Sequence, residues 1–526
     1  MNESMYFIFA IIPFLLIFLF MIILRWSALH SMPAVFVATA AISFLVWQMS
    51  LSTLFISFVK GILVVIEILL IVFFAILLLI IFKHSRKIEV IEHFLLTIST
   101  DARIQAVILG WSFVCLIEGA SGFGTPAALV APLLLYLGFN PITAVVIPLI
   151  GDSAPVTFGA VGTPINIGLG TLGFDKIVLE KVTLYSAIFH SILSIIVPLF
   201  IVYFVIKTYG KKFKDFKECI PFCIISWLSF SIPYLLTAYL FGPELPSIIG
   251  GASSLIITCY FAKKNLFVPK NKILLKKVRL KKVNFKHVIV AFLPYLFLVL
   301  SLVSIRAIKP LFNFLSQIYI SIPEFLGHSF NYKLYPFISP AFYFFMTCIF
   351  TLIIFRQKFN EICIECDLAA IRLKTAAISL LFTLGIVQIF IFSSINQSGL
   401  ESMPVIIANF LSQTFSHYYF VISPFIGALG SFIAGSNTVS NLLFGTLQAQ
   451  TATKLGVSFI GALVLQTVGG AIGNMIAIHN ILASSATIGL KGHEGNILRK
   501  TIKPAIVYCL LAGIFGFIAF VVFRIA

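Results

Sequence analysis

Long apolar runs that carry no charge constrain this chain more than any other feature. Met5–Leu24, Leu184–Ile206 and Pro336–Phe355 contain no Asp, Glu, Lys or Arg. Each run can cross a hydrocarbon layer of about 30 Å, which takes ~20 helical residues. Because backbone polar groups in lipid must bond within their own segment, we predict an all-α polytopic integral membrane protein. The runs are apolar all round instead of alternating, which argues against a transmembrane β-barrel.

The distribution of basic residues decides what the positive charge means. The chain has 36 Lys and Arg against 18 Asp and Glu, an excess that in a soluble protein would suggest nucleic acid. Here the basic residues gather in short connections, which the positive-inside rule places in the cytoplasm. We therefore expect no nucleic-acid partner, a location in the cytoplasmic (inner) membrane, and the N-terminus outside. The connections are Lys83–Lys87, Lys207–Lys217, Lys263–Lys286, Arg356–Lys374 and Lys491–Lys503.

Two Gly-rich, nearly uncharged stretches interrupt the apolar pattern, at 118–164 and 435–474. Gly- and Pro-interrupted segments at matching positions of two halves predict broken helices that meet near the bilayer midplane. The alternative is chance similarity between two Gly- and Ala-rich helices. A shift of 318 residues pairs Leu137 with Leu455, Gly138 with Gly456, Ile142 with Ile460, Ala144 with Ala462, Val146 with Val464 and Gly151 with Gly469.

The expected organisation is one transmembrane permease domain over residues 1–526. The chain has no phosphate-binding GxxxxGK segment, so we expect an ion or substrate gradient, not ATP, to drive it. The parts are a first half at 1–217 with a hairpin and a broken helix at 104–174, connecting helices at 218–374 with a basic cytoplasmic loop at 263–286, and a second half at 375–526 with a hairpin and a broken helix at 421–490.

Polar tips of the two stretches form the candidate binding site. The 318-residue register sets Glu118–Ser121 opposite Ser436–Val439. Hydroxyl and amide groups bind a carboxylate or an ion without a full buried charge, and glycines let backbone N–H groups approach. The alternative is that these small residues only let helices pack tightly. The predicted substrate-binding residues are Ser121, Gly122, Gly124, Thr125, Ser436, Asn437, Thr438 and Asn441.

Two acids supply the candidate coupling site. Glu118 and Asp152 are the only charged residues between Arg103 and Asp175. An ionised carboxylate at membrane depth costs about 2.5 to 3.5 kcal/mol on insertion scales, so it tends to be paired, hydrated or protonated. A nearby anionic substrate would favour the protonated form further. We predict Glu118 as the coupling residue and Asp152 as the second candidate; a helix-capping role is the alternative for Glu118.

Three ionisable residues outside these stretches also fall in apolar runs. Lys60 and Glu67 lie seven residues apart, near one face of a predicted helix. We expect them to form a structural ion pair inside the membrane. His190 is expected to be a neutral, hydrogen-bonded packing residue.

Both stretches resemble the lactate permease family, which carries EGAAGFG and later GSDTSSNALFGALQ. This chain has EGASGFG at Glu118–Gly124 and GSNTVSNLLFGTLQ at Gly435–Gln448, with further agreement at Phe241–Pro246 and Gly469–Met475. The resemblance implies proton-linked uptake of L-lactate, with D-lactate and glycolate as related 2-hydroxy monocarboxylates. The Ser436–Thr438 tip is also similar to those of sodium and dicarboxylate symporters. That likeness implies an ion-transporter superfamily fold with about 12 to 14 transmembrane helices, two inverted repeats, re-entrant hairpins and elevator motion.

The chain departs from the family pattern at three places. The family usually has Asp where Asn437 stands, Asn where Asp152 stands, and Lys followed by Met-Ile-Ser-Pro-Gln where Asn474 to Asn480 stand. The exchange at the first two positions leaves the local number of acids unchanged.

Other functions stay open at this point. Sodium-coupled carboxylate transport and an anion channel share the same broken helices; saturable uptake and counterflow would favour a carrier over a channel. Gly119–Gly122 is similar to the GxSG segment of rhomboid intramembrane proteases, with His190 or His479 as a base, which a peptide-cleavage assay would test. We assign no catalytic residue, cofactor or metal. The expected partners are a small carboxylate, a coupling proton or sodium ion, and the lipid bilayer, with a homodimer left open.

Overall fold

Helices account for nearly all of the structure. The computed structural model describes residues 3–24, 26–122, 124–275, 284–325, 328–357, 359–414 and 418–523. Within these residues, nine helices are long and apolar enough to span a membrane, or ten if the bent pair Pro141–Gly151 and Ala154–Leu169 is one span. The all-α polytopic class is therefore confirmed. The expected count of about 12 to 14 helices, the elevator-type fold and the outside N-terminus stay predictions.

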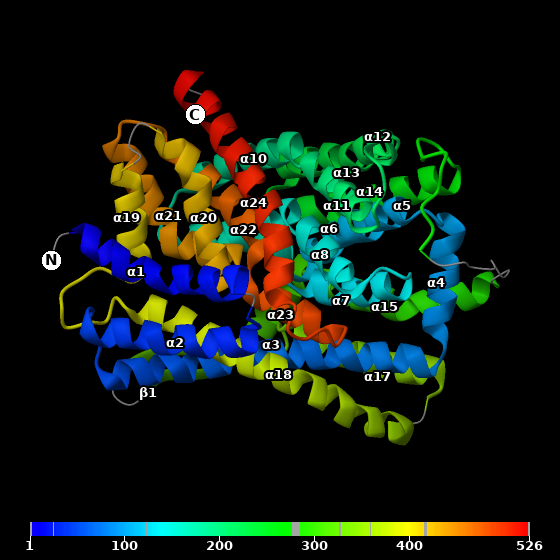
Figure 1. Ribbon diagram of the computed structural model, residues 1–526, viewed down its shortest axis with the longest axis horizontal. Coiled ribbons are helices and arrows are strands. Elements are labelled where there is room, and N and C mark those ends of the chain that lie inside the picture. Colours follow the sequence, from blue (N-terminus) through cyan, green and yellow to red (C-terminus); the bar gives the residue numbers. More distant parts are fainter. Residues whose placement is uncertain are drawn as a thin grey trace.

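One layer of the molecule consists of long helices that run side by side along the lower edge of Figure 1. Its two longest members, α3 and α18, have 34 residues each, and α3 begins after Ser50, whose hydroxyl accepts a hydrogen bond from the Thr53 amide at 3.1 Å. Close packing against the last long helix is possible because Gly61 meets Gly385. The helices are α1 (Glu3–Ile17), α2 (Ala28–Leu45), α3 (Leu51–His84), α17 (Pro340–Phe355) and α18 (Phe359–Phe392).

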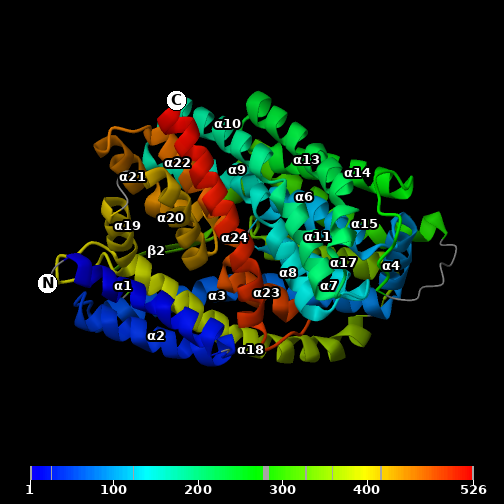
Figure 2. The ribbon, with the colours of Figure 1, turned by 45° about the horizontal axis from the view of Figure 1, so that its top comes forward.

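A second layer lies above the first and holds both Gly-rich stretches (Figures 1 and 2). The remaining helical elements are η1 (Phe18–Ile23), α4 (Lys87–Ile98), α5 (Ala102–Val107), η2 (Ile108–Phe113), α6 (Val114–Ser121), α7 (Thr125–Tyr136), α8 (Pro141–Gly151), η3 (Ala154–Phe158), α9 (Gly159–Thr163), η4 (Pro164–Leu169), η5 (Gly170–Leu172), α10 (Lys176–Leu193), α11 (Ile196–Thr208), α12 (Phe213–Lys217), α13 (Ile220–Phe241), α14 (Pro246–Lys263), α15 (Phe285–Ala307), α16 (Lys309–Ser316), α19 (Met403–Thr414), α20 (Tyr419–Ala434), α21 (Asn437–Lys454), α22 (Phe459–Gly473), η7 (Asn474–Ile476), α23 (Ile478–Thr487), α24 (Glu494–Gly516) and η8 (Phe517–Val522).

The turns that join α7 to α8 and α21 to α22 are alike. Gly138 and Gly456, which are 318 residues apart, both take positive φ after a helix end. Asn140 and Ser458 then cap the next helix by accepting a hydrogen bond from a backbone amide, at 2.8 and 3.1 Å. Matching caps at the spacing of the sequence repeat support a duplication of these segments.

The other ends of these helices do not follow the same register. α7 has 12 residues, whereas α21 has 18. The first hairpin tip therefore falls at Gly122 and Gly124, and the second at Gly435 and Ser436. The expected alignment of Glu118–Ser121 with Ser436–Val439 is wrong, because the longer α21 shifts the second tip along the chain.

A β-hairpin that the sequence did not predict packs against α3. Its strands are β1 (Ile320–Phe325) and β2 (His328–Leu334), which pair antiparallel. Lys60 Nζ donates to the Phe330 carbonyl at 3.0 Å and lies 4.9 Å from the centre of the Phe392 ring. The Tyr332 hydroxyl donates to Glu67. The expected Lys60–Glu67 ion pair is wrong, because the hairpin supplies each residue with a partner of its own.

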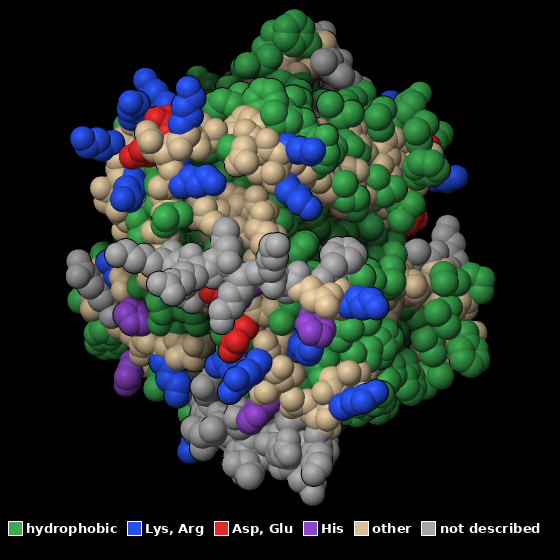
Figure 3. Space-filling view, turned by 90° about the vertical axis from the view of Figure 1, so that its right-hand side faces the viewer, with side chains coloured by type: hydrophobic (Ala, Val, Ile, Leu, Met, Phe, Trp, Pro, Cys, Tyr) green, Lys and Arg blue, Asp and Glu red, His purple; other side chains and the backbone are tan. Residues whose placement is uncertain are grey.

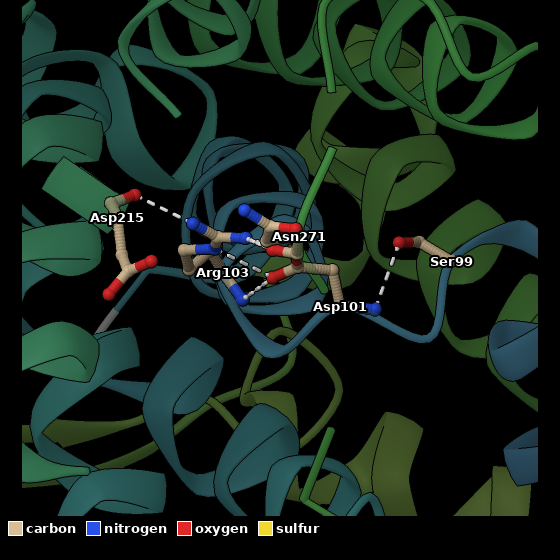
Figure 4. A network of polar contacts seen from close by, with 5 residues as sticks. All are labelled: Ser99, Asp101, Arg103, Asp215 and Asn271. Carbon is tan, nitrogen blue, oxygen red and sulfur yellow. Dashed lines mark hydrogen bonds and ion pairs between the residues drawn. The ribbon is translucent and has the colours of Figure 1, made fainter. Parts of the chain in front are cut away.

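A buried ion pair fastens the start of α5 to two later segments (Figure 4). Arg103 and Asp101 have exposed fractions of 0% and 2%, and Arg103 Nη2 lies 2.6 Å from Asp101 Oδ2. Arg103 also donates to the backbone carbonyls of Asp215, at 2.6 Å, and of Asn271. One side chain therefore holds the loop before α5, the helix α12 and the segment that follows α14 in fixed positions.

Basic side chains gather at the end of the molecule where α4 and α12 lie. Figure 3 shows this end, on which Lys and Arg are more frequent than Asp and Glu. The expected basic connection at 263–286 lies between the end of α14 at Lys263 and the start of α15 at Phe285, with residues 276–283 outside the described part. The expected connection at 356–374 differs from the prediction, because α18 begins at Phe359 and most of the segment is helical.

Candidate functional site

Between the two hairpin tips lies a small, partly open cavity of about 20 Å³. A space of this size holds about one water molecule. Both Gly-rich stretches contribute to its wall, so the fold brings the two polar segments together. The lining residues are Glu118, Gly122, Val156, Gly159, Ala160, Thr163, Pro164, Gly435, Ser436, Asn437, Thr438 and Asn474.

Half of the residues expected at the site line this cavity. They are Glu118, Gly122, Ser436, Asn437 and Thr438. The other half lie behind the wall, within the hairpins or at the helix break. These are Ser121, Gly124, Thr125, Asn441 and Asp152.

Hydroxyl groups close the first hairpin tip on itself. Ser121 Oγ donates to the Ile117 carbonyl at 2.9 Å and also contacts the Thr125 hydroxyl. Thr125 Oγ1 in turn donates to the Gly122 carbonyl at 2.8 Å. Gly122 and Gly124 have φ of +63° and +71°, which glycine adopts without a steric cost. These two hydroxyls therefore shape the tip and do not face the cavity.

The second tip reaches across to the first half of the chain. Thr438 Oγ1 donates to Thr163 Oγ1 at 3.4 Å, and Asn441 Nδ2 donates to the Pro164 carbonyl at 3.0 Å. Asn437 Nδ2 donates to the Thr467 carbonyl at 3.0 Å. Its Oδ1 is buried and has no hydrogen-bond partner among the described residues. The tip thus places the Thr438 hydroxyl at the cavity, while the Asn437 amide oxygen lies against Gly470 of α22.

The two acids lie together beside the cavity. Glu118 and Asp152 have exposed fractions of 2% and 0%, and their carboxyl groups are close enough to interact electrostatically. Two neighbouring carboxyl groups are costly to ionise together, because like charges repel. Asp152 Oδ2 accepts a hydrogen bond from Asn474 Nδ2 at 2.8 Å. Within the described part of the chain, Glu118 Oε2 and Asp152 Oδ1 have no partner, so each can accept a further hydrogen bond or proton.

The broken helix of the first half contains a left-handed turn that sequence reasoning missed. Ala160, Val161 and Gly162 have φ of +44°, +58° and +76° in succession. A β-branched residue with positive φ is rare, and such strain concentrates at functional sites. The turn brings Ala160, Thr163 and Pro164 to the cavity wall. The glycines of the Gly159–Gly162 segment were the only sequence signal for it.

The corresponding break in the second half also supplies residues that were not expected at the site. Asn474 lies in η7, where it lines the cavity and holds Asp152. Asn480, at the start of α23, donates to Asn474 Oδ1 at 2.9 Å and to its carbonyl at 3.1 Å. An unbroken chain of buried polar contacts therefore runs from Glu118 through Asp152 and Asn474 to Asn480.

Each hairpin packs against the broken helix of the other half. α7 contacts α23, and α21 contacts η4. The first break is also held from behind by His190, whose ring nitrogens bond to Thr157 Oγ1 at 2.7 Å and to Tyr508 Oη at 2.8 Å. His190 is thus the buried, hydrogen-bonded packing residue that was expected.

Comparison with known proteins shows the family to which the chain belongs. A family model described as L-lactate permease matches residues 6–523. The chain belongs to the L-lactate permease family. A relative from Haemophilus influenzae is 31% identical over 97% of this permease and 97% of its own length. The L-lactate permease of Escherichia coli K12 is 32% identical, covering 81% of this chain and 79% of its own. Glycolate permease GlcA of the same organism is 28% identical, covering 82% and 80%.

Membership of a permease family makes this protein a transporter and not an enzyme. The protease alternative is therefore wrong. The structure gives the physical reason, since the Ser121 hydroxyl donates to Ile117 and contacts Thr125. His190 bonds to Thr157 and Tyr508, so it is not positioned as a base for Ser121.

Proposed function

We propose that this permease takes up small 2-hydroxy monocarboxylates by symport with protons. L-lactate is the first candidate substrate, and D-lactate and glycolate are related ones. The names of the relatives, L-lactate permease and glycolate permease, support this substrate class. The observation that carries the proposal is the buried Glu118–Asp152 pair beside a cavity shared by both hairpin tips.

The chemistry of the cavity suits one carboxylate. Its polar lining comes from the acid Glu118 and from the uncharged Ser436, Asn437, Thr438, Thr163 and Asn474, and it contains no Lys or Arg. Hydroxyl and amide donors, with the N-terminus of α21, favour an anion but do not neutralise it. A substrate with a single negative charge is therefore less costly to bury here than a dicarboxylate.

The acid pair links substrate to proton. An anion in the cavity disfavours ionisation of the neighbouring carboxyl groups, because like charges repel. A proton on Glu118 or Asp152 favours the anion by the same amount, since coupling between two ligands is reciprocal. This mutual preference is what proton symport requires. Sodium coupling is the alternative, because carboxylate and amide oxygens also bind that ion.

Uptake of radiolabelled L-lactate by proteoliposomes tests the function. We expect saturable uptake, counterflow of preloaded lactate, and uphill accumulation when the interior is more alkaline than the medium. Glycolate and D-lactate should compete. Accumulation that follows a sodium gradient but not a pH gradient would replace the proton with sodium. Uptake that rises linearly with concentration, without counterflow, would contradict a carrier and favour a channel.

Thr438→Ala should weaken the apparent affinity for lactate by about 1 to 3 kcal/mol, because it removes a hydroxyl donor that lines the cavity. Ser121→Ala is the matched control. Its hydroxyl belongs to the same kind of tip but is used within the first hairpin, so the apparent affinity should change little. Concentration-dependent uptake at equal protein density measures both. Equal affinities in Thr438→Ala and the wild type would show that this hydroxyl only packs.

A further inference from the structure

The first turn of α23 touches both hairpin tips through two consecutive side chains. We propose that His479 and Asn480 are positioning residues that make the second hairpin and the acid pair move together. The proposal rests on the proposed function, since it identifies how substrate binding at one tip changes the conformation of the proton site. It assigns a role to a helix that none of the predicted site residues occupies.

His479 packs directly onto the second tip. Gly435 has φ of +59°, and a Cβ placed on it would lie 1.1 Å from His479 Cε1 and 1.9 Å from Nδ1. His479 is 6% exposed, and its ring lies directly against the Gly435 backbone. The ring therefore fills the place that a side chain at residue 435 would need, and the tip is not free to shift without displacing it.

Asn480 holds the first tip in the same way. Gly124 has φ of +71°, and a Cβ on it would lie 2.1 Å from Asn480 Oδ1 and 2.7 Å from Cγ. The Asn480 Cβ is farther away, at 3.5 Å, which is an ordinary contact distance. Asn480 is fully buried, so its side-chain amide cannot move aside into solvent. Adjacent residues of one helical turn thus contact the two tips, one residue for each tip.

The same amide group continues to the acids. Asn480 Nδ2 donates to Asn474 Oδ1, and Asn474 Nδ2 donates to Asp152 Oδ2. Consecutive residues of a helix cannot move independently, because their Cα atoms are fixed about 3.8 Å apart. A displacement of the second tip that moves His479 must also move Asn480. That movement alters the hydrogen bond that orients Asn474 toward Asp152, which is how the signal passes to the proton site.

Crossed suppression tests the two contacts. Gly124→Ala and Gly435→Ala should each reduce lactate exchange about tenfold or more, because both add a steric clash to a left-handed residue. Adding Asn480→Ala should restore exchange only in the Gly124→Ala protein. Adding His479→Ala should restore exchange only in the Gly435→Ala protein. Gly456→Ala is the matched control, since Gly456 has φ of +67° with no atom within 4 Å of the added Cβ. It carries the backbone strain without the clash and should stay within about twofold of the wild type.

Coupling is measured separately in the single variants. In Asn480→Ala and His479→Ala, pH-driven accumulation should fall about tenfold while exchange at equal concentrations changes by less than about twofold. Ser484→Ala is the control on the same helix, because its buried hydroxyl donates to the Asn480 carbonyl at 2.6 Å and touches neither tip. Its two readouts should keep the wild-type ratio. Asn480→Ser serves as a second variant if the alanine protein does not reach the membrane.

Three results would overturn the proposal. One is rescue of both glycine variants by either suppressor, which would indicate general loosening of the fold. Another is no rescue by either. The third is a parallel loss of accumulation and exchange in both Asn480 variants, which would mean a purely structural role. Failure of the proposed function is a different outcome, because the wild type itself would then show no lactate exchange or no pH-driven accumulation.

Discussion

Glu118→Gln is expected to abolish uphill, pH-driven uptake while lactate exchange at equal concentrations continues. Gln keeps the size of the side chain and its ability to accept hydrogen bonds, but it cannot gain or lose a proton. Glu118 is the acid that lines the cavity, so its protonation state is the one that an anionic substrate affects most directly. Without a titrating group there, binding of substrate no longer depends on binding of a proton, and the gradient cannot do work.

The measurement is accumulation of labelled lactate in proteoliposomes with an imposed pH gradient, compared with exchange in the same preparation. Asp152→Asn is the companion variant, since Asp152 interacts with Glu118 but does not line the cavity. Accumulation by Glu118→Gln at the wild-type level would move the proton site to Asp152. Wild-type accumulation by both variants would remove the acid pair from the coupling mechanism.

Arg103→Ala is expected to destabilise the protein by about 3 to 5 kcal/mol, because it leaves the buried Asp101 carboxylate without its charge partner. The two backbone carbonyls of Asp215 and Asn271 lose a donor as well. Thermal unfolding of the purified protein in detergent measures the change. Lys176→Ala is the control, because its ion pair with Glu180 is exposed to 90% and 62%, and such pairs contribute little.

A double variant separates charge from packing in this network. Asp101→Asn combined with Arg103→Ala removes the unpaired charge and should be less destabilised than Arg103→Ala alone. An unfolding temperature of Arg103→Ala equal to that of the wild type would show that the ion pair does not hold the three segments together.

Local properties of the sequence were enough to predict the class of the protein and part of its site. Apolar length fixes the polytopic helical class, and the uncharged Gly-rich stretches do meet at the cavity. Glu118 and Asn437 were identifiable because a charge or an amide in an apolar segment needs a specific partner. The predicted register of the tips was wrong because α21 is longer than α7, a difference that the matching residues near Gly138 and Gly456 do not reveal.

Other parts of the site depend on contacts between distant segments. Asn474 and Asp152 are far apart in the chain, and only the fold shows that they bond. The left-handed turn at Ala160–Gly162 is formed by ordinary residues whose conformation the surroundings impose. Lys60 and Glu67 have suitable spacing for an ion pair, yet each forms a hydrogen bond with the β-hairpin instead. Spacing along one helix cannot anticipate a competing partner from another segment.

The small size of the cavity has a consequence for selectivity. A space of about 20 Å³ is several times too small for lactate, so the proposed function requires the tips to part before a substrate is enclosed. Part of the free energy of binding is then consumed by separating Thr438 from Thr163, and the measured affinity is weaker than the contacts alone would give. A bulkier acid requires a wider separation and loses more of its binding energy. The permease would therefore discriminate between acids through the free-energy cost of separating the tips, without a pocket that is already shaped to the substrate.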